Sequence, residues 1–216
     1  MLDGVIPPLL VIVVALVLVG LRRLYPNGTG RRAVLADAAV IIAIVCFAAL
    51  MEIEMGRTPT YRHGRVRLWS GDVRSDQNSQ QVFDPYAFTH MIHGAAFYGL
   101  TWIALGPTSL GLRAIVGTTL ESAWEVYENT DSVINRYRAA TISLGYYGDS
   151  LVNSVGDILA CVVGFLLARR LPALLTVAWV VAIEVILVVW VRDNLTLNIV
   201  MLLYPISAIR TWQMGP

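Results

Sequence analysis

Long runs of apolar residues, each close to the length of a membrane-spanning helix, follow one another along most of this 216-residue chain. Hydrophobic residues make up 56% of the sequence and charged residues 14%, a balance that soluble domains do not have. Because a bilayer core about 30 Å thick needs roughly 20 apolar residues per helix, we predict a polytopic all-α transmembrane bundle. Residues 1–216 are expected to form one membrane domain, which excludes a soluble enzyme held by a single anchor.

The apolar runs predict about seven spans, with six as the smaller number. The expected spans are residues 5–21, 33–51, 88–105, 112–127, 151–167, 173–191 and 195–209. The seventh run is short, so a kinked or re-entrant element is the alternative there. Residues 52–87 are rich in Gly, Ser, Arg, Asp, Asn and Gln and have no helical period, which indicates a long loop outside the membrane.

Small residues recur at every fourth position along the expected fifth span, at Gly156, Ala160, Gly164 and Ala168. Such a face lets the backbones of two helices approach closely. We expect this face to pack against another helix of the same chain rather than to form a dimer.

The positions of arginine predict the orientation in the membrane. Four arginines bracket the turn at residues 26–28, namely Arg22, Arg23, Arg31 and Arg32. Compact Arg-rich turns stay in the cytoplasm, whereas long polar loops cross the membrane despite their charge. Alternation of the spans then puts four more arginines on the cytoplasmic side, namely Arg113, Arg169, Arg170 and Arg210. We therefore expect the bacterial inner membrane, a periplasmic N-terminus, a periplasmic loop 52–87 and a cytoplasmic C-terminus.

Polar and ionisable residues gather at the outer ends of three expected spans. They follow i, i+3 or i+4 spacing and so share helical faces; they are His90, His93, Glu121, Glu125, Asp149, Asn153 and Asp157. A charge inside the bilayer costs at least about 2.5 kcal/mol, so such groups must face inward and find partners. The pattern predicts a polar cavity that opens toward the periplasm.

This set of residues suits two kinds of chemistry. As acid/base groups, the expected catalytic residues are Glu121, Glu125, Asp149 and Asp157. Zn, Mn and Fe prefer imidazole and carboxylate ligands, so the expected metal ligands are His90, His93, Glu121, Glu125 and Asp149. An anionic headgroup is expected to bind at the rim, at Arg136, Tyr137, Arg138, Asn153, Arg192 and Asp193. The alternative is a structural network of interfacial side chains without a ligand.

Several short strings resemble an uncharacterised alphaproteobacterial inner-membrane family, DUF2585 (UPF0314). They are Gly71-Asp72, Asn78-Ser79-Gln80, Thr89-His90, His93-Gly94, residues 121–129, Ile134-Asn135-Arg136-Tyr137-Arg138, Gly148-Asp149-Ser150 and Arg192-Asp193-Asn194. The resemblance runs from about Met55 to the C-terminus. It implies an inner-membrane location, and it implies no particular activity because the family has none established.

We expect the cavity to bind or act on an amphiphile, either a membrane phospholipid or a lipid-linked phosphate. Two other functions stay open. One is a non-catalytic accessory subunit of a larger membrane complex, with Trp69 and Asn78-Ser79-Gln80 on the contact surface. The other is a small transporter that uses Asp157 and Glu184 as ion sites near the middle of the membrane. The formal net charge of +1 argues against nucleic acid as a partner.

Overall fold

The computed structural model describes residues 4–24, 30–143 and 145–215 of the chain. Within these residues the protein is all-α, with nine helices and a single isolated bridge between Trp69 and Phe83 instead of a sheet. The helices are α1 (Ile6–Leu24), α2 (Arg31–Glu54), α3 (Ala87–Leu105), α4 (Leu110–Glu128), α5 (Asp131–Ala140), α6 (Leu151–Arg170), α7 (Ala173–Val191), α8 (Leu195–Leu203) and α9 (Ser207–Met214). Residues 25–29, which contain the predicted turn, and the side chains of Arg22 and Arg23 lie outside the described part.

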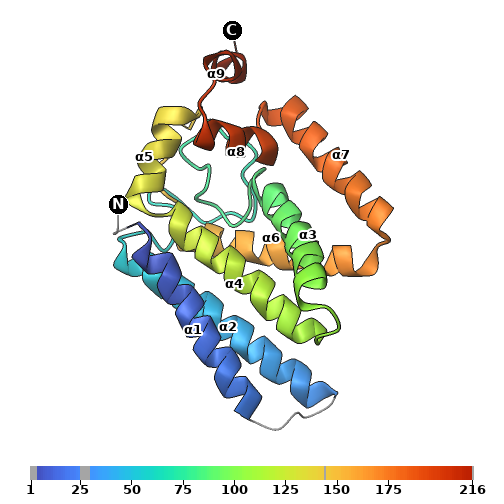
Figure 1. Cartoon of the computed structure of the whole chain (residues 1–216). Coiled ribbons are helices and arrows are strands. Elements are labelled where there is room, and N and C mark those ends of the chain that lie inside the picture. The colour runs from blue at the N-terminus through green and yellow to red at the C-terminus, as the bar shows by residue number, and fades with distance from the viewer. Residues whose placement is uncertain (1–3, 25–29, 144, 216) are drawn as a thin grey trace.

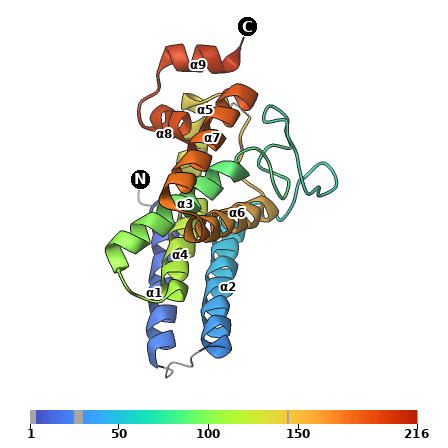
Figure 2. The same cartoon turned by 90° about the vertical axis from the view of Figure 1, so that its right-hand side faces the viewer.

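Three helices in the described part, α2, α6 and α7, are long and apolar enough to cross a membrane, and α1 holds a shorter apolar stretch over Ile6–Leu21. α3 and α4 have comparable length, but polar side chains interrupt their apolar faces. In Figures 1 and 2, α1, α2 and α4 lie side by side, α6 crosses α3, and α7 leans away from the other helices. This arrangement is compatible with a membrane protein.

Two glycines explain how closely α3 and α6 cross. A side chain at Gly94 on α3 would collide with the backbone carbonyl of Cys161, and one at Gly164 on α6 would collide with the carbonyl of Met91. The small residues of α6 therefore pack within the chain, as predicted. Because both contacts are between backbones, they hold the two helices at a fixed separation.

The expected seventh span is two short helices instead. α8 ends at Leu203 and α9 begins at Ser207, with Pro205 between them. Proline lacks a backbone N–H and disfavours helix at the residue before it, so one helix cannot run through this position. The first turn of α8 lies against α7, where the Glu184 carboxylate accepts hydrogen bonds from the Leu195 and Thr196 backbone N–H groups at 3.0 and 3.1 Å. Glu184 thus holds the start of α8 and does not pair with Asp157.

The C-terminal segment lies at the same end of the molecule as the long loop (Figure 2). Arg74 in that loop donates a hydrogen bond to the Gln213 carbonyl at 3.2 Å, and the Gln213 amide donates to Asp193 at 3.0 Å. This position differs from the predicted one, because the chain does not cross the bundle again after α7. Arg210, on α9, therefore also lies at the loop end rather than with Arg113, Arg169 and Arg170.

The long loop is ordered by backbone contacts with the beginning of α6. The Ser150 N–H donates to the Ser79 carbonyl at 3.0 Å, and the Leu151 N–H donates to the Thr58 carbonyl at 2.9 Å. The buried Gln80 side chain donates to the Gly148 carbonyl at 2.8 Å. These contacts bring the loop over the end of the bundle that contains most of the predicted site residues.

Candidate metal centre

A cavity of about 350 Å³ lies between α3, α4, α6 and α8, beneath the long loop. Its polar lining includes His90, His93, Glu128, Tyr146, Asp149 and Asp157. Its apolar wall is formed by Phe97, Leu120, Trp124, Ile199 and Leu202. Every residue of that apolar wall is partly exposed, whereas His90, Asp149 and Asp157 are buried. His90, Asp149 and Asp157 therefore lie deepest, whereas His93, Glu128 and Tyr146 are half-buried, as is most of the apolar wall.

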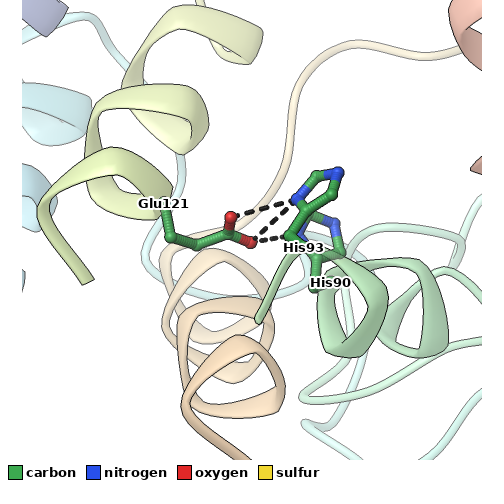
Figure 3. A group of neighbouring side chains, drawn as sticks. All are labelled: His90, His93 and Glu121. Carbon is green, nitrogen blue, oxygen red and sulfur yellow. Dashed lines mark hydrogen bonds and ion pairs between the residues drawn. The ribbon is translucent and has the colours of Figure 1, made fainter. Parts of the chain in front are cut away.

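Two histidines of α3 and one glutamate of α4 converge at the polar end of the cavity (Figure 3). The i, i+3 spacing puts His90 and His93 on one face of α3, opposite the fully buried Glu121. The Nδ1 atom of His90 lies 2.6 Å from Glu121 Oε1, and the Nδ1 atom of His93 lies 3.0 Å from Glu121 Oε2. Two imidazoles and one carboxylate in ligand range are a donor set that suits Zn, Mn or Fe.

A second group of potential ligands shares His90. Glu125 Oε1 lies 3.2 Å from His90 Nδ1, and Asp157 Oδ2 lies 3.9 Å from His90 Nε2. One oxygen of each carboxylate, Glu125 Oε1 and Asp157 Oδ1, is buried and makes no hydrogen bond within the described part of the chain. The His90 ring therefore lies between Glu121 and Glu125 on one edge and Asp157 on the other.

Negative charge dominates this end of the cavity. Among the described residues that line it, Glu128, Asp149 and Asp157 are acidic and none is an arginine or lysine. Glu121 and Glu125 add two buried carboxylates directly against His90. Buried carboxylates need protons, cationic side chains or metal ions as counter-charges, and among the described lining residues only His90 and His93 could become cationic side chains.

Asp149 lines the cavity but belongs to neither group of metal ligands. Its Oδ2 atom accepts hydrogen bonds from the Asn129 amide and the Tyr146 hydroxyl, both at 2.9 Å. Burial raises the pKa of Asp149 to about 6, against the lowering effect of these two donors. A carboxyl group with a pKa near neutrality can both accept and donate a proton, which suits the acid/base role expected for it.

The arginines predicted to bind an anion do not line the cavity. Arg136 is exposed, and its Nε donates to the Leu202 carbonyl at 2.8 Å. Arg138 is also exposed, and its guanidinium donates to the Tyr146 carbonyl. Tyr137, between them, does line the cavity and donates to the Asn198 side chain at 3.2 Å. α5 therefore contributes its tyrosine to the cavity wall and uses both arginines to hold neighbouring backbone.

Three further residues predicted to bind substrate also lie outside the cavity lining. Asn153 is buried in α6, and its Nδ2 makes no hydrogen bond within the described residues. Arg192 adopts a left-handed conformation with φ of 58° and donates to the Trp212 carbonyl at 3.2 Å. Asp193 accepts a hydrogen bond from Tyr86 at 3.1 Å and another from Gln213. The last two residues fasten the C-terminal segment to the end of α7.

Several lining residues carried no signal in the sequence. Tyr146 belongs to a connection without helical period, and Asn198, Ile199 and Leu202 belong to a run that reads as membrane span. The i+3 spacing from Glu121 places Trp124 on the same face of α4 as the acidic residues, whereas Leu120 had no such signal because a leucine near a span end is typical of lipid contact.

Comparison with known proteins identifies relatives along most of the chain. The model of a family described as "Protein of unknown function (DUF2585)" matches residues 52–215. A UPF0314 protein from Paracoccus denitrificans is 48% identical over 170 residues, which cover 79% of this chain and 88% of the relative. UPF0314 proteins from Rhizobium meliloti and Sphingopyxis alaskensis are 47% and 46% identical, and the alignments cover 81% and 82% of this chain and 88% and 94% of those relatives. No solved structure matches the chain significantly.

Proposed function

The chain belongs to the DUF2585 family, and from this premise we propose that it is a membrane-embedded, metal-dependent enzyme acting on the phosphate group of an amphiphile. The substrate class is a membrane phospholipid or a lipid-linked phosphate. The observation that carries the proposal is the convergence of His90, His93 and Glu121 at the buried polar end of the cavity.

The donor set supports a catalytic rather than a structural metal. Structural zinc sites are closed by four protein ligands, whereas catalytic sites use three and leave a position for water or substrate. His90 and His93 both line the cavity, so an ion held by them and Glu121 would face open space. When bound, such an ion would supply positive charge to a phosphate oxygen and would lower the pKa of a bound water.

The shape and polarity of the cavity support an amphiphilic substrate. An acyl chain would contact the apolar wall of Phe97, Leu120, Trp124, Ile199 and Leu202, which is the more exposed part of the lining. The phosphate would lie at the buried end, near the metal ligands. Because arginine is missing from the described lining, the affinity for an anionic group depends on the metal.

Hydrolysis is the simplest reaction for this arrangement. Water adds to phosphorus, the bond between phosphorus and the lipid oxygen breaks, and the lipid leaves as an alcohol. Asp149 takes the proton from the attacking water and returns it to the leaving oxygen. The Tyr146 hydroxyl, which donates to Asp149 at 2.9 Å, orients that carboxylate.

The test compares Glu121→Gln with Glu54→Gln, a matched change at an exposed position on α2. Purified protein is stripped with a chelator, reloaded with Zn²⁺ or Mn²⁺, and assayed for phosphate release from phosphatidic acid in mixed micelles. We expect Glu121→Gln to lower turnover by about 100-fold or more, as when one transition-state-stabilising group is removed, and Glu54→Gln to match wild type. Equal turnover in both variants, or a wild-type protein that binds no metal, would contradict the proposal.

We also propose that the chain is one inner-membrane domain crossed by six helices, α1, α2, α3, α4, α6 and α7. Arg31, Arg113, Arg169 and Arg170 lie near the ends away from the long loop, which supports a cytoplasmic position for those ends. The long loop and both chain ends would then be periplasmic. Alkaline phosphatase fused to the C-terminus should be active and green fluorescent protein fused there should stay dark; the reverse pattern would exclude this orientation.

A second candidate function is a non-catalytic subunit of a larger membrane complex. Val66, Leu68 and Trp69 in the long loop have exposed side chains, with Leu68 71% exposed, and such a patch suits contact with another protein. Ser79 and Gln80 are buried, so the predicted Asn78-Ser79-Gln80 surface is largely unavailable. A stoichiometric partner that co-purifies after mild solubilisation, and that Leu68→Asp removes, would favour this function.

A further inference from the structure

Glu125 and Asp157 form a pair of buried carboxylates next to the proposed metal-binding site (the first metal seat) at His90, His93 and Glu121. Glu125 is 1% exposed and Asp157 is 4% exposed. One ligand oxygen from each lies within 4.8 Å of the other and of a ring nitrogen of His90. This spacing is compatible with two carboxylates that bind one cation from opposite sides.

The hydrogen bonding leaves this pair unsatisfied. His90 Nδ1 lies 2.6 Å from Glu121 Oε1 but 3.2 Å from Glu125 Oε1, so a proton on Nδ1 would be directed to Glu121. Glu125 Oε1 and Asp157 Oδ1 have no hydrogen-bond partner in the described part of the chain. A buried carboxylate oxygen without a donor is costly, and either a proton on the carboxylate or a bound cation removes the cost.

The balance of charges in the cavity also favours a second cation. If one divalent ion binds His90, His93 and Glu121, the imidazoles are neutral ligands and the ion offsets two negative charges. Glu121 supplies one of these, while Glu125, Asp157, Glu128 and Asp149 lie in or beside the same cavity. One ion therefore leaves several carboxylates that need either protons or a second cation.

We propose that Glu125 and Asp157 hold a second divalent cation, so that the site is a two-cation centre arranged around His90. This inference rests on the proposed function, because it takes the seat at His90, His93 and Glu121 as the first cation site. The second seat offers carboxylate oxygens and room for water, which suits a hard cation such as Mg²⁺ or Mn²⁺.

A second cation would supply the additional positive charge that the binding of a phosphate substrate requires. Paired ions about 3.5–4 Å apart bind both the attacking and the leaving oxygen of a phosphoryl group. They would also supply the positive charge that arginine does not supply along this cavity lining. Asp157 itself lines the cavity, so an ion bound there would be in reach of substrate.

The experiment uses the full chain in detergent, stripped with a chelator and reloaded with Mn²⁺ alone. Bound metal is counted by mass spectrometry, and the ions are examined by electron paramagnetic resonance, which distinguishes a spin-coupled Mn²⁺ pair from an isolated ion. Wild type should bind two ions per chain and show the coupled spectrum. Asp157→Asn and Glu125→Gln should each bind one ion with the uncoupled spectrum, and Glu54→Gln should match wild type.

One ion per chain with an uncoupled spectrum in wild type overturns the second seat and leaves the proposed function standing. Two coupled ions without phosphate release from any lipid phosphate support the second seat and count against the proposed function. Unchanged metal content in both Asp157→Asn and Glu125→Gln also overturns the proposal. A circular dichroism melt of each variant shows that the chain is folded, and having two independent variants keeps the test decisive if one of them does not fold.

Discussion

Asp193 is the residue at which the last helices are joined to the bundle. Its carboxylate accepts hydrogen bonds from Tyr86 at 3.1 Å and from Gln213 at 3.0 Å, and it is 2% exposed. Burial raises the pKa of Asp193 from 3.8 to about 6, although these donors lower it. The charged form is therefore less stable in the folded protein than in the unfolded chain.

We predict from this that the protein loses stability as the pH rises from about 4 to about 6. The folded pKa is above the unfolded one, so the contribution is complete below pH 3.8 and lost once the pH exceeds about 6. The loss is up to about 3 kcal/mol, at 1.36 kcal/mol per pKa unit. Thermal unfolding in detergent at several pH values measures this loss of stability. In Asp193→Asn, stability should change little between about pH 4 and about pH 6. An equally steep loss in that variant would show that Asp193 is not the group responsible.

At the scale of the element, the crossing of α3 and α6 depends on glycine. Gly94 lies against the backbone of Cys161 and Phe165, whereas Gly99 on the same helix has open space around it. Backbone cannot move aside as a flexible side chain does, so the two positions should respond in opposite ways to the same added methyl group.

We therefore predict that Gly94→Ala destabilises the protein by about 1–3 kcal/mol or more through overpacking. Gly99→Ala should be neutral or stabilising by about 0.5–1 kcal/mol, because alanine is the better helix former. Unfolding of both variants in detergent measures the difference. Similar stabilities for the two would show that the helices are not in backbone contact.

α8 depends on Glu184 in a comparable way. The carboxylate accepts from two backbone N–H groups at the first turn of α8, where a negative charge is favourable. We predict that Glu184→Ala costs about 1–2 kcal/mol and loosens α8 before the rest of the bundle. Hydrogen exchange should rise first over residues 195–203. Uniform exchange along the whole chain would instead indicate a global loss of stability.

The helices that carry the site were predictable from sequence, and the surroundings of the site were not. The i+3 and i+4 spacings in α3, α4 and α6 correctly indicated that His90, Glu121 and Asp157 face a common interior. Periodicity within one helix does not fix which neighbours it meets. Arg136 and Arg138 were expected at the rim because the intervening α5 and its rotation could not be deduced from a polar connection. The shortness of the seventh run did suggest a kinked element, but the break at Pro205 was not predicted because the apolar residues on both sides of it read as a single span.

For the whole molecule, the proposed metal binding would be coupled to folding stability. The ligands come from α3, α4 and, for the second seat, α6, so an ion bound by them would stabilise only the assembled bundle. Binding to the folded state alone stabilises it by about 2.7 kcal/mol when free metal is 100 times the dissociation constant.

We predict that Mn²⁺ raises the unfolding temperature of the chelator-treated protein by roughly 5–10 °C, since a protein of this size gains about 2–4 °C per kcal/mol. A series of scans at increasing Mn²⁺ concentration measures the effect. The shift should be much smaller for His93→Asn and unchanged for Glu54→Gln. A shift of equal size in His93→Asn would mean that the ion binds elsewhere.

The backbone contact at Gly94 has a consequence for which ions the site accepts. His90 is four residues before Gly94 on α3, and Asp157 is four residues before Cys161 on α6, so each potential ligand is only about 6 Å along its helix from the point where the two backbones touch. The separation of the two helices at these ligands is thus set by main-chain contact, which leaves only the side-chain rotamers to adjust the gap between the ligand atoms. A gap restricted in this way discriminates by ionic radius, and we expect the larger Ca²⁺ to compete poorly with Mn²⁺ or Zn²⁺ even at millimolar concentration.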